Sequence, residues 1–450
     1  ILGSVWPTFS FYWEKGYKGI FNSIVDFDYI SFSIDQEFQI GTMGKSYYIL
    51  KTGKFVNQDS VLYIDKKFFR ESDSDPIFRY LLSQPLYSFQ NLDSSYETQD
   101  FYAELHYIHH FNGSIINKIP FMKKTGIQSL AGGGVLYLPD RRVEKAGWPL
   151  IVWSHGTVGI ADQCAPSWSG RQEQDRRYLQ VWLEAGFAVV ASDYQGLGTK
   201  GTHPYLATRP AAYSNLDAIR AVVSEPSFDL SGQTILVGQS QGASAALATL
   251  GTVKDYAPTL SVMGAVLTGV PYFRPDAMVN LMQSRPKDRI DPMLGYNLLA
   301  LTVVQMIDQE FFLEDYINSE FLEIAKSVQT TCHKDVKAKV IEAQLTYNNL
   351  FKRAPTAPLE RAFSLFSYPS FSLPAPIFIG VGAKDRDTPV YMQAALAKTL
   401  CDNGTSVHAM LYPEYDHKSV VLPSATDSLM FVQSIMAGTL GSSDCGALPF

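Results

Sequence analysis

Residues 234–249 have the sequence TILVGQSQGASAALAT, in which a short turn joins an apolar run to a run rich in alanine. The apolar residues 234–237 predict a buried strand, and residues 243–249 predict a helix. Between them lies the pattern Gly-x-Ser-x-Gly at Gly238–Gly242. A turn this tight needs small residues two positions before and after its centre, and it exposes the central hydroxyl at the positive end of the helix. We therefore predict that Ser240 is a catalytic nucleophile; the alternative is a glycine-rich turn whose serine has no chemical role.

Short apolar runs alternate with helical patterns on both sides of this turn. We predict strands at 134–138, 150–154, 187–193, 234–237, 262–269, 376–381 and 407–412, and helices at 171–184, 215–224, 243–249, 390–400 and 425–436. Several strands are almost continuously apolar, which is typical of a sheet that helices cover on both faces. The alternation predicts an α/β fold of the hydrolase type, with a mostly parallel sheet flanked by helices.

Two segments interrupt this alternation. Residues 272–370 contain helical patterns such as Leu298–Ile307 and Asp335–Phe351, which predict an inserted helical cap. Residues 1–125 have alternating runs at Tyr29–Ile40 and Tyr47–Val56, which are compatible with hairpins or with a loose extension. We therefore divide the chain into an N-terminal extension of unknown role (1–125), a hydrolase core in two parts (126–271 and 371–450), and the cap (272–370).

Composition excludes several classes of function. The 450-residue chain has 37 Lys and Arg against 44 Asp and Glu, a net charge of −7, without a basic stripe that would bind nucleic acid. Its longest apolar run, Leu298–Ile307, is too short for a transmembrane helix. The glycine-rich segment 192–206 lacks the Lys-Ser/Thr ending of a phosphate-binding loop. We therefore expect that it binds no nucleotide. The four cysteines do not have the spacing of zinc ligands, and we expect no metal and no organic cofactor.

A serine nucleophile needs a base, and histidine is the usual one near neutral pH. In the hydrolase layout the base comes last in the chain, and only three of the eight histidines follow Ser240. His333 lies in the predicted cap and His408 inside a predicted strand. His417 follows the last strand at its carboxyl end, where ligand sites of open α/β sheets form. We therefore choose His417 as the base; the alternative is a histidine of a surface loop.

The remaining catalytic groups are expected in loops after other strands. The acid should follow the strand 376–381, and we choose Asp385 because it leaves that strand first, with Asp387 as the alternative. An oxyanion hole needs two backbone N–H groups. One comes from Gln241, directly after the nucleophile. We choose Thr157, in the loop after strand 150–154, for the second, with Gly156 as the alternative.

Several motifs together resemble the secretory lipase family of α/β-hydrolases. They are SHGT at 154–157, ADQCAPS at 161–167, the segment 193–206 and GQSQG at 238–242, in this order. The resemblance covers about 134–229 and 234–271 and resumes around 376–417. It implies a helical cap over the active site, a triad of Ser240, Asp385 and His417, and hydrolysis of carboxylic esters including acylglycerols. It also implies two disulfides, Cys164–Cys332 and Cys401–Cys445. The first 120 residues do not resemble the family's N-terminal segment, and the cap does so only loosely.

We therefore predict a secreted serine carboxylic ester hydrolase, similar to triacylglycerol lipases, which acts as a monomer on ester or lipid substrates at a lipid–water interface. The alternatives are a serine peptidase or an acyltransferase on the same fold. An inactive binding protein is disfavoured because all three triad residues are present. Sequons at Asn112 and Asn403 are compatible with a glycoprotein, and because the chain begins at Ile1 we expect any targeting segment to have been removed or left out. Six side chains of the cap either line an acyl pocket or only pack its helices together: Met278, Met282, Met293, Met306, Phe311 and Phe312.

Overall fold

The chain divides into two compact units, Ile1–Ala131 and Gly132–Phe450. The computed structural model describes residues 6–18, 26–39, 45–60, 67–68, 97–98, 101–110, 133–139, 147–199, 201–274 and 285–450. The predicted boundary at 125/126 lies outside the described residues.

The first unit contains a four-stranded antiparallel sheet. Its strands are β1 (Thr8–Gly16), β2 (Asp26–Gln39), β3 (Lys45–Ser60) and β6 (Tyr102–His110), in the order β1-β2-β3-β6. The short strands β4 (Lys67–Phe68) and β5 (Glu97–Thr98) pair separately. The two alternating runs of the sequence thus form the hairpin β2–β3 rather than a loose extension. One face of the sheet buries Phe27, Tyr29, Phe55 and Tyr102, while Phe9, Phe11 and Trp13 are exposed on the other.

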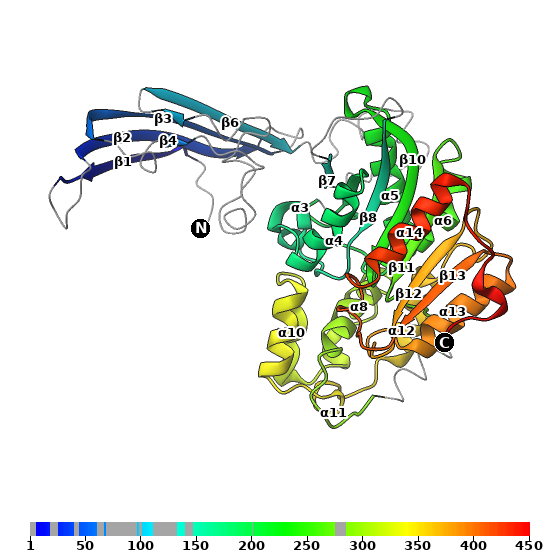
Figure 1. Cartoon of the computed structure of the whole chain (residues 1–450). Coiled ribbons are helices and arrows are strands. Elements are labelled where there is room, and N and C mark those ends of the chain that lie inside the picture. The colour runs from blue at the N-terminus through cyan, green and yellow to red at the C-terminus, as the bar shows by residue number, and fades with distance from the viewer. Residues whose placement is uncertain are drawn as a thin grey trace, which may run out of the picture. The chain divides into compact units, whose positions relative to one another are not determined.

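The second unit is built on a seven-stranded sheet (Figure 1). In sheet order its strands are β13 (Val407–Tyr412), β12 (Ile377–Gly382), β11 (Ser261–Thr268), β10 (Leu230–Gln239), β8 (Trp148–Ser154), β9 (Ala188–Ser192) and β7 (Gly134–Tyr137). All neighbours are parallel except β7, which runs antiparallel to β9. The predicted α/β-hydrolase fold, with a mostly parallel sheet, is confirmed.

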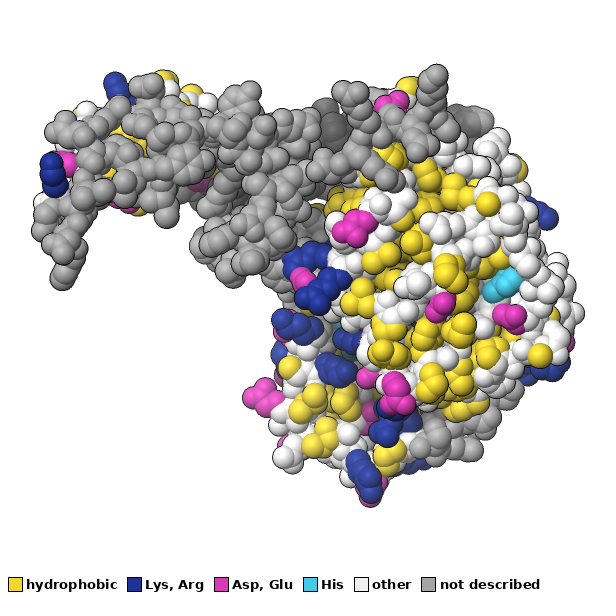
Figure 2. Space-filling model, viewed as in Figure 1, with side chains coloured by type: hydrophobic (Ala, Val, Ile, Leu, Met, Phe, Trp, Pro, Cys, Tyr) yellow, Lys and Arg dark blue, Asp and Glu magenta, His cyan; other side chains and the backbone are white. Residues whose placement is uncertain are grey.

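Helices cover both faces of this sheet, which explains the nearly continuous apolar strands. On one face α5 (Thr208–Val223), α6 (Gln241–Tyr256) and α13 (Val390–Asp402) pack with Leu150 and Val152 of β8. On the other face α4 (Glu173–Glu184) and α14 (Ala425–Ala437) pack with the alternate residues Ile151 and Trp153. Figure 2 shows hydrophobic side chains on the surface over α14 and β13, where Met410 and Met430 are exposed.

Between β11 and β12 the chain forms a helical segment with a hydrophobic core of its own. Its helices are α8 (Leu294–Ile307), α9 (Leu322–Ser327), α10 (His333–Glu342), α11 (Tyr347–Leu350) and α12 (Thr356–Phe366). The helical pattern at 335–351 forms two helices, α10 and α11, with a break between them. Gln344 has a φ of 50°, a left-handed conformation that ends the first helix, and Thr346 caps the next one through a reciprocal capping box with Asn349.

Short elements and two disulfides complete the unit. The short helices are η6 (Asp162–Cys164), α3 (Pro166–Ser169), η7 (Pro226–Phe228), η8 (Leu313–Asp315), η9 (Ser319–Phe321) and η10 (Asp444–Gly446). Cys164 is bonded to Cys332, which joins η6 to the start of α10, and Cys401 is bonded to Cys445, which joins α13 to the C-terminal tail. These are the two pairings that the family resemblance implies. In the described part of the chain, no helix combines the length and apolar character that a membrane span requires.

Candidate active site

Ser240 lies at a sharp turn between β10 and α6, in a backbone conformation that side chains rarely adopt. Its φ is 56° and its ψ is −121°. A Cβ atom at Gly238 would lie 2.1 Å from the carbonyl oxygen of Gly242, and one at Gly242 would lie 1.8 Å from the carbonyl oxygen of Ser154. Both glycines of the sequence pattern are therefore required by close backbone approach. The Ser240 amide donates to the carbonyl of Thr268 at 2.9 Å and fixes the turn against β11.

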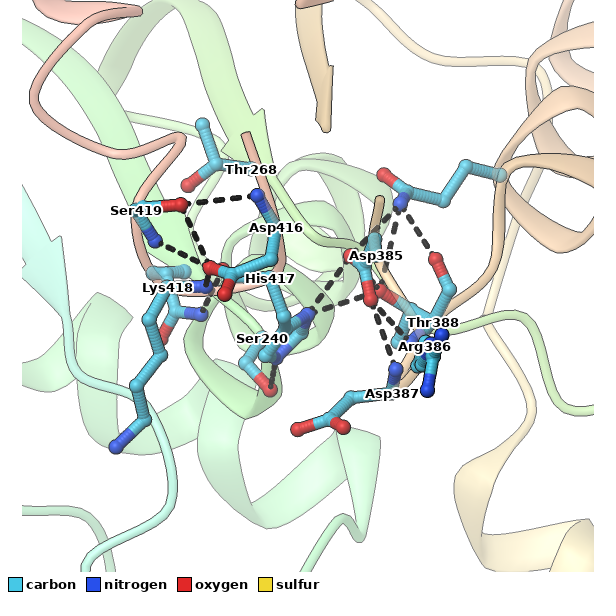
Figure 3. Close-up of polar contacts among 12 residues, drawn as sticks. Ser240, Thr268, Asp385, Arg386, Asp387, Thr388, Asp416, His417, Lys418 and Ser419 are labelled. Carbon is cyan, nitrogen blue, oxygen red and sulfur yellow. Dashed lines mark hydrogen bonds and ion pairs between the residues drawn. The ribbon is translucent and has the colours of Figure 1, made fainter. Parts of the chain in front are cut away.

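The structure brings the three predicted triad residues together (Figure 3). The Nε2 atom of His417 lies 2.8 Å from the Ser240 hydroxyl oxygen, and its Nδ1 atom lies 2.8 Å from Oδ2 of Asp385. His417 follows β13 and Asp385 follows β12, both at the carboxyl ends of parallel strands. Both side chains are buried. A proton can thus pass from the serine to an imidazole whose other nitrogen donates to a carboxylate.

Surrounding hydrogen bonds hold the Asp385 carboxylate in place. Oδ1 accepts from the amides of Asp387 and Thr388 at 2.9 and 2.8 Å, and Oδ2 accepts from the Thr388 hydroxyl at 2.8 Å and the Gln393 amide at 3.2 Å. Burial disfavours the charged imidazolium of His417. The hydrogen bond to Asp385 and the charges of Asp385 and Asp387 outweigh that effect, and the pKa of His417 is raised above its usual value. The site therefore favours the imidazolium that forms when the base takes a proton.

The other residues considered for the acid and the base make different contacts. Asp387 makes no hydrogen bond to His417; its Oδ2 accepts from the Tyr296 hydroxyl at 3.4 Å. His333 is buried and stacks on Tyr296 with ring centroids 4.1 Å apart, and burial lowers the pKa of His333 to about 4. His408 lies in β13 against Phe431.

The expected oxyanion donors come from two elements beside Ser240. Gln241 is the first residue of α6, so its amide belongs to the unsatisfied N–H groups of the helix start. Thr157 follows β8, and its hydroxyl lies 2.9 Å from the hydroxyl of Tyr205. The oxyanion roles of the Gln241 and Thr157 amides stay predictions.

A buried histidine that was not predicted from sequence contacts the side chain of Gln241. His203 Nε2 lies 2.9 Å from the side-chain amide nitrogen of Gln241, and its Nδ1 lies 2.8 Å from the carbonyl oxygen of Gln195. Burial lowers the pKa of His203 to about 4, so the ring is neutral near pH 7. Its Nδ1–H then donates to the carbonyl, and Nε2 accepts from Gln241. No local motif marks His203, because its partner lies 38 residues away in the chain.

A pocket opens beside Ser240, between the sheet and the helical segment. Its apolar lining comes from both parts: Tyr205, Leu206, Pro271, Phe273, Met293, Tyr296, Ala300, Leu359, Phe363, Phe366 and Met392. Of the six cap residues considered from sequence, Met293 lines this pocket. Met306 and Phe312 are exposed and Phe311 packs among the cap helices, so for these three the acyl-pocket interpretation is wrong. Met278 and Met282 lie outside the described residues. No cluster of His, Cys, Asp and Glu that could hold a metal ion occurs in the described part of the chain.

The sheet topology, the strained serine turn and the order Ser–Asp–His define the second unit as an α/β-hydrolase with a serine-centred site. Residues 170–284 match the family model described as "Secretory lipase". Lipase A of Moesziomyces aphidis is 25% identical to this chain; the match covers 63% of this chain and 64% of that protein. Lipase A of Arthroderma benhamiae is 22% identical; the match covers 58% of this chain and 56% of that protein. The second unit of this chain is therefore similar to the secretory lipase family. The matches span less than two thirds of the length of these curated relatives.

Solved structures agree on the fold. Lipase A of Candida antarctica superposes with a TM-score of 0.55 at 17% identity, covering 92% of this chain and 83% of that chain. The rice cell wall degrading esterase LipA of Xanthomonas oryzae superposes with a TM-score of 0.52 at 12% identity, covering 96% of this chain and 98% of that chain. Residues 1–144 match a different family model, described as "Family of unknown function (DUF5686) C-terminal domain". The N-terminal region therefore resembles a different family from the catalytic unit.

Proposed function

We propose that this chain is a serine carboxylic ester hydrolase that forms an acyl-enzyme on Ser240. The observation that carries the proposal is the continuous chain of contacts from Asp385 through His417 to Ser240, with both links at 2.8 Å. The strained serine turn and the neighbouring pocket support it, because they present the hydroxyl to a bound substrate. The names of the relatives, lipases and an esterase, favour an ester over a peptide or an acyl acceptor as the substrate.

The proposed reaction runs in two halves. His417 Nε2 takes the proton of Ser240 as its oxygen attacks the ester carbonyl, while Asp385 stabilises the imidazolium that forms. The amides of Gln241 and Thr157 stabilise the oxyanion. His417 then gives its proton to the departing alkoxide, which leaves an acyl group on Ser240. Water activated by His417 attacks the acyl-enzyme and releases the carboxylic acid.

The proposal also covers substrate and location. The largely apolar pocket suits the organic part of an ester, and the substrates we propose are acylglycerols or similar esters at a lipid–water interface, cleaved by a monomer. Secretion is supported by two disulfides, which persist best in oxidising compartments. Of the two sequons, Asn403 is exposed at the end of α13 and accessible to glycosylation, whereas Asn112 lies outside the described residues.

Hydrolysis of p-nitrophenyl esters from C2 to C16 and of an emulsified triglyceride tests the proposal. Ser240→Ala should lower kcat by about 10⁴- to 10⁶-fold while the protein stays folded. Ser261→Ala, at the exposed start of β11, is the matched control and should keep its activity. Near-normal turnover by Ser240→Ala would overturn the nucleophile assignment. Turnover that peaks at long chains and includes the emulsion would establish a lipase, and turnover confined to short soluble esters an esterase.

A further inference from the structure

One carboxylate outside the triad faces the pocket beside Ser240. Asp387 and Ser240 line the same pocket, and Figure 3 shows the Asp387 side chain extending on the Ser240 side of the triad. Its carboxylate has one hydrogen bond to another side chain, from the Tyr296 hydroxyl at 3.4 Å. No Lys or Arg of the described ranges forms an ion pair with it. Arg285, which reaches the carbonyl of Arg386, is already paired with Asp291.

Aromatic side chains form part of the pocket wall. Two tyrosines and three phenylalanines line it: Tyr205, Tyr296, Phe273, Phe363 and Phe366. Placing a carboxylate among such side chains without a cationic partner costs free energy. A hydrocarbon chain in the pocket would leave the carboxylate unpaired, and a substrate with its own carboxylate would be repelled. A cation, by contrast, forms a charge-assisted contact with Asp387 and interacts favourably with the aromatic ring faces.

We propose that, among the acylglycerols and similar esters proposed above, this pocket favours those that carry an ammonium group, which pairs with Asp387 and contacts the aromatic rings of the lining. The inference rests on the proposed function, since it names the substrate class of the same site. Asp387 is a specificity-determining residue in this scheme, whereas Asp385 orients the base. The two carboxylates are two residues apart, and their roles differ because only Asp385 contacts His417.

Matched pairs of neutral and cationic esters test the proposal. A choline ester and its 3,3-dimethylbutyl isostere place the charge in the alcohol part. The p-nitrophenyl esters of 4-(trimethylammonio)butanoic acid and 5,5-dimethylhexanoic acid place it in the acyl part. The measured quantity is the ratio of kcat/KM for the cationic and the neutral member. This ratio cancels any effect of Asp387 on His417, because both members use the same base.

We expect the wild type to prefer the cationic member of at least one pair by about tenfold or more, and Asp387→Asn to remove that preference. Asn keeps the size of the side chain and its contact with Tyr296. Asp255→Asn is the charge-matched control, because Asp255 is exposed and lies 14 residues beyond Gln241 on α6, about 21 Å along the helix. The control should keep the preference. A ratio near one for both pairs, or a preference that survives in Asp387→Asn, would overturn the proposal.

A binding measurement separates this inference from the proposed function. Tetramethylammonium is titrated into Ser240→Ala protein by calorimetry, which needs no turnover. We expect binding that weakens about tenfold or more in the Ser240→Ala/Asp387→Asn double variant. If no ester is hydrolysed but this Asp387-dependent binding is present, the proposed activity fails and the ammonium site stands. If the neutral esters are hydrolysed and tetramethylammonium does not bind, the activity stands and the ammonium site fails.

Discussion

Replacement of Gly242 by Ala tests whether the close approach of α6 and β8 shapes the catalytic turn. The new Cβ would lie 1.8 Å from the carbonyl oxygen of Ser154 and 2.7 Å from that of His155. Ordinary van der Waals contact begins at 3.4 Å, so α6 and the end of β8 must separate by about 1.6 Å. Neither side of this contact is a flexible side chain that can turn away. We therefore expect a loss of about 3 kcal/mol in unfolding free energy, at the upper end of the usual cost of overpacking.

The same displacement should also lower kcat, in addition to its effect on the unfolding free energy. Helix α6 carries Ser240 and Gln241 at its start, while the loop after β8 carries Thr157. Moving the two elements apart separates the proposed oxyanion donors from each other and from the nucleophile. A misplacement of about 1 Å in an active site costs about 10²-fold in rate. Urea unfolding and the kcat for p-nitrophenyl butyrate measure the two effects.

Gly441→Ala is the matched control for this experiment. A Cβ at Gly441 would meet no atom within 4 Å, and its φ does not lie in the left-handed region. We expect its stability and turnover to match those of the wild type. If Gly242→Ala kept its unfolding free energy within about 0.5 kcal/mol and its kcat within about twofold, the tight approach of β8 and α6 would not be needed for the site. That result would refute a role for close backbone approach at Gly242 in shaping the serine turn.

Two further predictions concern pH and cross-linking. The surroundings of His417 raise its pKa above the usual value of 6.5, and only the neutral imidazole can act as the base. As the pH is lowered, kcat/KM for a neutral ester should therefore decrease with a midpoint above pH 6.5. Lys418→Gln removes a positive charge that disfavours the imidazolium, so the midpoint in a pH–rate profile should move higher; a downward move would contradict the assignment. The disulfide Cys401–Cys445 closes a loop of 44 residues, for which the chain-entropy model gives about 4 kcal/mol. The double Ser variant should lose about that much in urea unfolding and keep its activity at 25 °C, and a loss below about 1 kcal/mol would show that the model does not apply.

The proximity of the three proposed triad residues could be predicted from sequence because sheet topology constrains where they lie. The carboxyl ends of parallel strands meet at one edge of the sheet, so a residue that directly follows β10, β12 or β13 lies close to the others. Ser240, Asp385 and His417 each follow one of these strands, in the chain order of the hydrolase layout. The glycines of the serine turn carried similar information, since only a close backbone approach requires them at both positions.

Features that depend on contacts across the fold could not be predicted in this way. The bond between His203 and Gln241 joins a loop to a helix start, and neither sequence segment indicates it. The break between α10 and α11 depends on the left-handed conformation of Gln344, a residue type that normally favours a helix. The cap residues Met306 and Phe312 are as apolar as Met293, yet only Met293 faces the pocket, because helix packing decides which side is covered.

The pair Asp385 and Asp387 illustrates the limit most sharply. In the sequence the two are carboxylates of one polar loop, and only their positions along the chain favour Asp385. In the structure the loop turns back on itself, so that the amides of Asp387 and Thr388 both donate to Asp385 and fix its carboxylate against His417. The same turn places Asp387, which has no hydrogen bond to the imidazole, in the lining of the pocket beside Ser240. The backbone bonds that fix Asp385 against His417 therefore leave the Asp387 carboxylate free to line the pocket. For this reason Asp387→Asn should change which esters are cleaved, whereas Asp385→Asn should reduce the cleavage of all of them.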